Sequence, residues 1–221
     1  MLDLHTHTVF SDGSLIPAEL VRRAKTAGYT GVALTDHMDA SNMDWILENQ
    51  KAGLSLMGPH LEMDLFLGAE LTHVPPGLIP ELADRARENG SSLVVVHGET
   101  LAEPVSEGTN LAAVEAGVDI LAHPGLITRE EAELAAQNGV ALEISTRKGH
   151  CLANGHVAQM ARQCGASLVI NNDAHEPRDF VDKEMRHRIA FGAGLDKEEL
   201  LQAEQTSRRI AERILLELAG S

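Results

Sequence analysis

Leu93-Val94-Val95-Val96-His97 is the stretch that decides the fold, because a short apolar, β-branched run ends in a side chain that can bind a metal. Such a run is typical of a strand buried on both faces, as in a parallel sheet. Similar runs recur from one end of the chain to the other. The predicted strands are Leu2–His5, Gly31–Thr35, Leu65–Glu70, Leu93–His97, Asp119–Ala122, Ala141–Ser145 and Leu168–Asn171.

Amphipathic segments between these runs predict helices. Pro17 lies in the first turn of one segment that stops before Gly28, and Thr128 is expected to cap another. The predicted helices are Ser14–Ala27, about Asp44–Lys51, Pro80–Asn89, Thr128–Asn138, Asn154–Cys164 and Lys197–Ala219. Strands that alternate with helices indicate an α/β fold made of parallel βα units. Because seven strands are one short of a TIM barrel, we expect a distorted (β/α)7 TIM-like barrel.

The bulk properties fit one domain of ordinary globular composition. The chain has 221 residues, of which 43% are hydrophobic, so we expect a single domain over residues 1–221 with the helix at about 197–219 packed on the barrel. The formal net charge of −15 argues against a stable nucleic acid or anionic membrane partner. No signal peptide or bilayer-spanning run is visible, and Cys151 and Cys164 do not form a disulfide framework, which predicts a cytoplasmic protein. The sequence does not indicate the oligomeric state.

Histidines and carboxylates follow the ends of the predicted strands. The carboxyl ends of parallel strands share one face, so these side chains are expected to converge. Imidazole nitrogens and carboxylate oxygens suit Zn, Mn and Fe, and so many ligands suit two or three divalent ions rather than one. A bridging carboxylate in such a cluster is used on phosphate esters. The predicted metal ligands are His5, His7, Asp12, His37, Glu70, His97, His123, Asp173 and His175.

Five other histidines lie outside this set; His60 falls in a loop that contains Gly and Pro, and the other four have weaker signals. His73 follows Glu70 by three residues and is expected near the mouth of the barrel. His150 follows the sixth strand and is a candidate substrate contact. His156 and His187 fall on helical segments, for which surface positions are the simpler interpretation.

Six motifs over about residues 2–180 resemble, in order and spacing, those of the PHP (polymerase and histidinol phosphatase) superfamily. Asn172 stands where serine is common, but every ligand position holds a competent residue. The motifs are Asp3-Leu4-His5-Thr6-His7-Thr8 with Ser11-Asp12-Gly13-Ser14, Thr35-Asp36-His37, Gly68-Ala69-Glu70-Leu71, Val96-His97, Ala122-His123-Pro124 and Asn172-Asp173-Ala174-His175.

This resemblance implies a PHP fold, a seven-strand barrel with a trinuclear site that holds zinc, manganese or iron. It also assigns the ligands to the three ions. The first ion would be bound by His5, His7, Glu70 and Asp173, the second by Glu70, His97 and His123, and the third by Asp12, His37 and His175.

A metal cluster of this kind predicts hydrolysis by a metal-bound hydroxide, because coordination lowers the pKa of water toward ~7. Asp12 and His175 are candidates for assisting the leaving group. Arg147, beside Lys148, is the preferred phosphate contact and Arg178 the next. Asp36 is expected to orient a ligand imidazole, with a helix cap or a solvated loop acid as the alternative.

The leading functional prediction is hydrolysis of a small phosphate monoester, such as a histidinol phosphate-like compound or a nucleotide. One alternative is a PHP-type nuclease or phosphodiesterase, or a proofreading partner of a polymerase. Another is a non-catalytic RNA-binding subunit, because 94–99 and 115–124 also resemble the PHP-like subunit of ribonuclease P. Such a subunit is expected to be basic and to lack most ligands, whereas this chain is acidic and keeps them. Specificity is expected in the loops Ser41–Asp64, His73–Leu78, Gly98–Thr109 and Thr146–Gly155.

Overall fold

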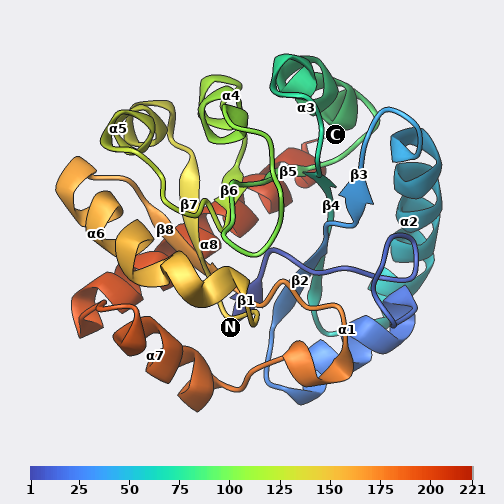
Figure 1. Ribbon diagram of the computed structural model, residues 1–221. Coiled ribbons are helices and arrows are strands. Elements are labelled where there is room, and N and C mark those ends of the chain that lie inside the picture. The colour runs from blue at the N-terminus through green and yellow to red at the C-terminus, as the bar shows by residue number, and fades with distance from the viewer. Residues whose placement is uncertain (221) are drawn as a thin grey trace.

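All the predicted strands form and pair in parallel, in the order β1-β2-β4-β5-β6-β7-β8. The computed structural model describes residues 1–220, and in it helices ring a nearly closed barrel of these strands (Figure 1). The predicted seven-strand TIM-like barrel is therefore confirmed. The strands are β1 (Leu2–Asp3), β2 (Gly31–Leu34), β3 (His37–Met38), β4 (Asp64–Leu71), β5 (Leu93–His97), β6 (Ile120–Ala122), β7 (Ala141–Ser145) and β8 (Leu168–Asn171).

The short strand β3 continues the line of β2 and does not add a position to the barrel. Leu34 at the end of β2 pairs with Leu67, and His37 in β3 pairs with Glu70 farther along the same strand, β4. The interruption at residues 35–36 therefore leaves two predicted ligands side by side on neighbouring strands.

The barrel closes between β1 and β8 at the level of the candidate ligands. Thr6 forms a parallel bridge with Ala174, and the backbone N–H of His7 donates to the Ala174 carbonyl at 2.9 Å. One step earlier, the Leu4 N–H donates to the Asn171 side chain at 3.0 Å. Because a side-chain amide replaces a backbone partner there, β1 ends at Asp3 and not at the predicted His5.

Five of the eight α-helices among the described residues agree with the prediction, and the exceptions are α2, α4 and α7. Thr128 and Glu131 form a capping box, so the predicted cap is confirmed. The second helix is longer than predicted and reaches Met57, and α4 and α7 were not located from the sequence. None of the described helices is long and apolar enough to span a membrane. The helices are α1 (Pro17–Thr26), α2 (Met43–Met57), α3 (Ile79–Glu88), α4 (Thr109–Glu115), α5 (Arg129–Asn138), α6 (Asn154–Cys164), α7 (Lys183–Gly192) and α8 (Lys197–Ala219).

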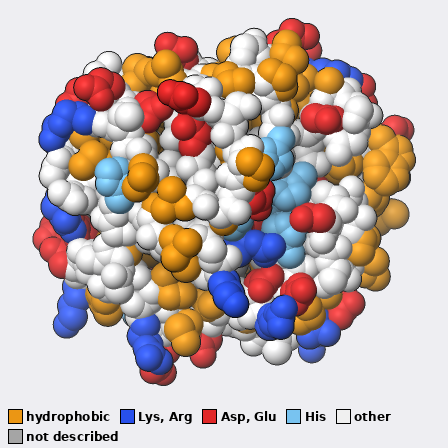
Figure 2. Space-filling model, in the orientation of Figure 1, with side chains coloured by type: hydrophobic (Ala, Val, Ile, Leu, Met, Phe, Trp, Pro, Cys, Tyr) orange, Lys and Arg blue, Asp and Glu red, His pale blue; other side chains and the backbone are white. Residues whose placement is uncertain are grey.

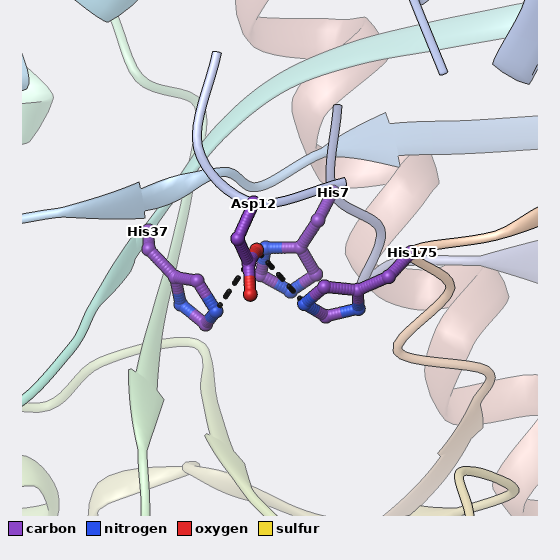
Figure 3. Close-up of side chains that lie close together, drawn as sticks. All are labelled: His7, Asp12, His37 and His175. Atoms are coloured by element: carbon purple, nitrogen blue, oxygen red, sulfur yellow. Dashed lines mark ion pairs between the residues drawn. The ribbon is translucent and has the colours of Figure 1, made fainter. Parts of the chain in front are cut away.

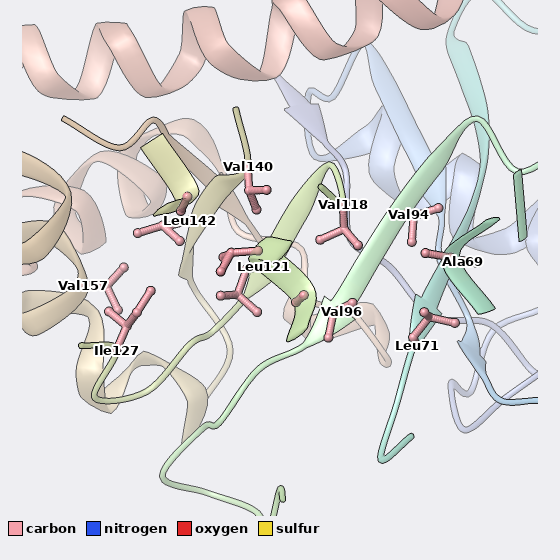
Figure 4. Packing of buried hydrophobic residues seen from close by; sticks show 14 of the residues in the cluster. Ala69, Leu71, Val94, Val96, Val118, Leu121, Ile127, Val140, Leu142 and Val157 are labelled. Carbon is pink, nitrogen blue, oxygen red and sulfur yellow. The ribbon is translucent and has the colours of Figure 1, made fainter. Parts of the chain in front are cut away.

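Two apolar layers stabilise the barrel. Along β5, Val95 points into the barrel interior, whereas Val94 and Val96 face the surrounding helices, as the two-residue period of a strand requires. Figure 4 shows part of the outer layer, including Val94, Val96 and Leu121. Burial of such side chains contributes about 1.5–3 kcal/mol each.

Helix α8 closes the amino end of the barrel, and it lies behind the strands in Figure 1. Ala211 and Ile214 of this helix pack on the interior cluster that contains Phe66 and Val95. Arg213 Nη2 donates to Asp119, the residue before β6, at 2.6 Å. The opposite, carboxyl end is thus the open face.

Candidate metal centre

The nine predicted ligands meet at the carboxyl ends of the strands. In Figure 2, drawn in the orientation of Figure 1, histidines gather in one hollow of this face, with Lys and Arg side chains at one edge. The ligands come from the β1–α1 connection (His5, His7, Asp12), from β3 (His37), β4 (Glu70) and β5 (His97), and from the segments after β6 (His123) and β8 (Asp173, His175).

The carboxylate of Glu70 lies at the centre of the cluster and is fully buried. Both of its oxygens face imidazole nitrogens, as a carboxylate that bridges two metal ions would. The neighbouring atoms are His5 Nε2 (3.1 Å), His37 Nδ1 (2.5 Å), His97 Nδ1 (3.4 Å), His7 Nε2 (3.7 Å) and His123 Nε2 (3.7 Å).

Asp173 is the second buried carboxylate of the cluster. Its Oδ1 lies 3.2 Å from His7 Nε2 and 3.8 Å from His5 Nε2, and its Oδ2 lies 3.7 Å from His123 Nε2. His5, His123 and Asp173 present ligand atoms within 4.8 Å of one another, as do His5, His7 and Glu70. The two carboxylates therefore share the imidazoles of His5 and His7 as neighbours.

A more open group surrounds Asp12. Figure 3 shows His7, His37 and His175 turned toward its carboxylate. Asp12 Oδ1 lies 3.0 Å from His175 Nε2 and 3.5 Å from His37 Nε2, and the rings of His7 and His175 stack at 4.1 Å. The Asp12 side chain is 58% exposed, so this group is accessible to solvent.

The buried ligand atoms lack the partners that burial normally demands. Among the described residues, no hydrogen bond reaches either ring nitrogen of His7, His97 or His123, nor His5 Nε2 or Glu70 Oε1. A buried polar atom without a partner costs about 1–3 kcal/mol. Divalent ions would satisfy these lone pairs together, so the donor set fits a metal cluster.

Without an ion, the protonation equilibria suit metal binding at Glu70, His7 and His123, whereas His5 would have to lose a proton to bind a metal. Burial lowers the pKa of His5, but the carboxylates of Glu143 and Glu70 outweigh it and hold that pKa well above its usual value. Burial raises the pKa of Glu70, yet neighbouring imidazoles, His5 first, hold it well below its usual range. Burial and nearby imidazoles lower the pKa of His7 and His123 well below normal. Ionised carboxylate and neutral imidazole are the forms that bind a metal.

Backbone strain is concentrated at this face. His73, His123 and Asp173 have φ values of 52°, 28° and 52°, and they are the non-glycine residues with positive φ among residues 1–220. Such conformations cost energy in L-residues and persist where the surrounding structure enforces them, often at functional sites. Two of the three are predicted ligands, and the third lies beside them.

Sequence reasoning missed Glu143, which orients the His5 ring. Its Oε2 lies 2.8 Å from His5 Nδ1 and accepts a hydrogen bond from Asn171 Nδ2 at 3.0 Å. With Nδ1 so engaged, Nε2 of His5 is directed at Glu70 and the metal position. The available signal was an acidic residue inside the otherwise apolar strand Ala141–Ser145.

Asp36 has a different role from the one expected. Its carboxylate accepts hydrogen bonds from the backbone and hydroxyl groups of Thr8 and Ser11 and from Gln50. Asp36 thereby shapes the loop that carries Asp12. The Nδ1 atom of His37 instead lies 2.6 Å from Thr72 Oγ1.

The predicted substrate-binding residues lie at unequal depths. Arg147 is 26% exposed; its Nη1 donates to the Asp173 carbonyl at 3.1 Å, and its Nε lies 3.7 Å from Asp173 Oδ2. The Arg178 side chain is 82% exposed and pairs with Glu176 at 2.8 Å. His150 is buried, and its ring stacks on that of His123 with the ring centres 4.2 Å apart. A hydrogen bond of 2.8 Å joins His150 Nδ1 and Thr100 Oγ1.

Two cavities flank Asp12. The larger, about 580 Å³, is lined by the basic side chains Arg147, Lys148 and Arg178, for which we call it the cationic cavity, and also by the carboxylates of Asp12, Glu176 and Asp179. The smaller, about 280 Å³, contains His37, Thr72, His73 and Glu103. The cationic cavity is thus in contact with the metal cluster through Asp12 and His175.

His156 and His187 lie away from the cluster. His156 Nε2 lies 2.7 Å from the Ile127 carbonyl, and His187 Nε2 lies 3.7 Å from Glu204.

Several known proteins resemble this chain in sequence. An uncharacterised protein of Methanocaldococcus jannaschii is 46% identical over 90% of this chain and 92% of that protein. Ribonuclease P protein component 3 of Methanosarcina mazei is 29% identical over 92% of this chain and 85% of that protein. The DNA polymerase/3'-5' exonuclease PolX of Bacillus subtilis is 25% identical over 78% of this chain but only 34% of its own length.

Solved structures agree on the fold. Ochratoxinase from A. niger superposes with a TM-score of 0.60 at 13% identity, over 96% of this chain and 71% of that one, which supports the barrel architecture alone. The sequence model of the PHP domain matches residues 3–119, just over half of the chain. That match includes the ligands from His5 to His97, and we conclude that the protein belongs to the PHP family.

Proposed function

We propose that this protein is a metal-dependent phosphoesterase that hydrolyses a small phosphate monoester. The observation that carries the proposal is a cluster of imidazoles and carboxylates in which many buried polar atoms lack hydrogen-bond partners, placed directly beside a cavity that holds three basic side chains. Zinc, manganese or iron fits such a donor set.

The chain's own residues would hold two or three divalent ions around Glu70. Glu70 and Asp173 supply the buried carboxylates, His5 and His7 lie between them, and Asp12 faces the open side. When bound, such ions lower the pKa of a coordinated water toward ~7 and neutralise phosphoryl oxygens. The resemblance to PHP proteins supports the trinuclear arrangement.

Arg147 would bind the phosphoryl group. Its guanidinium lies between the buried Asp173 and the 580 Å³ cavity, so a phosphate bound there contacts the arginine and the cluster together. A planar guanidinium can donate two parallel hydrogen bonds to phosphate oxygens. Lys148 and Arg178 add positive charge along the same cavity, where the rest of the substrate would lie.

The leaving oxygen requires a proton or a cation. Asp12 and His175 lie 3.0 Å apart at the boundary between the cluster and the cavity. We assign assistance of the leaving group to this pair, because no other acid–imidazole pair lines the cationic cavity among the described residues.

The proposal is tested with purified protein by combining metal analysis with a substrate panel. The panel contains sugar phosphates, mononucleotides, bis(p-nitrophenyl) phosphate and single-stranded oligonucleotides. We expect bound Zn, Mn or Fe, turnover of a phosphomonoester, and loss of turnover in His5→Ala. His187→Ala is the matched control, because this histidine lies on α7 outside the cluster.

Two results would overturn the proposal. A metal-loaded protein that is inert toward every phosphomonoester is not the proposed enzyme. Turnover of oligonucleotides alone would make the protein a nuclease, which the similarity to PolX of Bacillus subtilis favours as a second candidate.

A third candidate, a non-catalytic RNA-binding subunit, is favoured by the 29% identity to ribonuclease P protein component 3. The formal charge of −15 opposes it, because phosphate contacts by Lys and Arg supply most non-specific affinity for RNA. RNA gel-shift titration at low salt distinguishes this candidate, since the phosphoesterase is expected to show no stable complex.

A further inference from the structure

A second group of metal-binding side chains lies at the rim, beside the cluster. His73 follows β4, His97 ends β5, and Glu103 lies in the connection from β5 to α4. Glu103 Oε2 lies 3.3 Å from His73 Nε2 and 3.3 Å from His97 Nε2. One ligand atom from each of the three residues lies within 4.8 Å of the other two.

His73 Nε2 and Glu103 Oε2 are hydrogen-bonded at 3.3 Å, so the evidence for an ion comes from His97. Its side chain is only 2% exposed, and neither ring nitrogen has a hydrogen-bond partner among residues 1–220. Nε2 is close to the Glu103 carboxylate without the alignment of a hydrogen bond, as expected when both atoms face a common ion. A buried nitrogen of this kind is directed into the rim group and requires a partner.

The other two ligands are accessible. The side chains of His73 and Glu103 are 45% and 39% exposed, and both line the 280 Å³ cavity. A cation can therefore enter from solvent and keep water on its remaining positions. Two imidazoles and one carboxylate suit zinc, manganese or iron.

We propose that His73, His97 and Glu103 bind a further divalent cation at the rim, in addition to the ions held around Glu70. His97 would bind the rim ion through Nε2, while its Nδ1 lies 3.4 Å from Glu70 Oε1. Because a neutral imidazole binds an ion through one nitrogen, His97 would then be a ligand of the rim ion instead of the ion that the family resemblance assigns to Glu70, His97 and His123. This site goes beyond the proposed activity and does not require it.

The test is metal stoichiometry, measured by equilibrium dialysis against Mn²⁺ or Zn²⁺ followed by elemental analysis. Glu103→Gln removes the carboxylate, and His73→Asn removes an imidazole with a residue that tolerates positive φ. Each variant is expected to bind one ion fewer than the unchanged protein. Glu107→Gln, an exposed carboxylate of the same connection, is the control and is expected to bind the full number.

A crystal soaked in Mn²⁺ provides an independent readout. An anomalous peak between the three side chains supports the site, and its loss in Glu103→Gln confirms the ligand. Unchanged stoichiometry in both variants, or no anomalous density at the rim at saturating metal, would show that the group is an ion-paired network only. Because both substituted side chains are partly exposed, thermal unfolding should remain cooperative in both variants, and if one fails to fold the other decides.

Discussion

Both ends of the barrel contain fully buried side chains, but the buried groups are chemically opposite. At the amino end, Ala211 and Ile214 of α8 pack on apolar interior residues such as Phe66, and this burial stabilises the fold. At the carboxyl end, His7 and Glu70 are also fully buried, but several of their polar atoms have no protein partner. Burial there is unfavourable until a ligand is bound. The comparison indicates that one end carries stability and the other carries chemistry.

Glu70→Ala should have the largest effect, at the carboxyl end. The substitution removes the carboxylate that several imidazoles face and that would bind the ions together with them. We therefore expect loss of bound metal and of phosphoesterase turnover. Elemental analysis and the substrate panel measure both. Glu62→Ala, whose side chain is 97% exposed, serves as the control. A Glu70→Ala protein that keeps its metal content would disprove the central position of this residue.

Ile214→Ala should have the converse effect, at the amino end. The fully buried side chain leaves a cavity, which lowers the free energy of unfolding by about 2–5 kcal/mol. Metal stoichiometry should not change. Denaturant unfolding measures the loss, and Leu216→Ala, at a position that is 74% exposed, should stay within about 0.5 kcal/mol of the unchanged protein. Loss of metal in Ile214→Ala would mean that the two ends are not separable.

Glu143→Gln tests how finely the carboxyl end is organised. The carboxylate facing His5 Nδ1 at 2.8 Å is replaced by an amide of the same shape, which holds the ring less firmly and reduces its basicity. We expect metal affinity about 10–100-fold weaker with the fold retained. Competition titration with a chelating dye measures this affinity. Affinity equal to that of the unchanged protein would assign Glu143 a purely structural role.

Arg147→Ala should give the smallest of these effects, because it removes a substrate contact and no ligand. We expect KM for the phosphomonoester to rise about tenfold, which corresponds to about 1.4 kcal/mol, close to the lower end of the range for a hydrogen bond to a charged group. Metal content should be unchanged. Arg178→Ala should change KM less, because that side chain is 82% exposed and paired with Glu176. An equal effect of the two substitutions would contradict the assignment of Arg147.

The positions of the strands and ligands were predictable because both signals are local. The run before His97 is apolar and β-branched, and Thr128 with Glu131 forms a cap within four residues. The helices α4 and α7 were not located. Helix α4 begins after Gly108 without a side-chain cap, so its packing against the barrel, rather than a local signal, decides its bounds. Helix α7 has weak amphipathic character, and its local signal is the N-cap Asp182, which sequence reasoning missed.

The sequence by itself determined the alternation of strands and helices, the count around the barrel and the identity of the candidate metal ligands. These follow from periodicity and from the side-chain types at strand ends. Only the tertiary structure decided that Glu143 supports His5, that Asp36 shapes the Asp12 loop, and that Glu103 faces both His73 and His97. These contacts join residues on separate elements, and their distances depend on the closure of the barrel, which no local pattern of the sequence records.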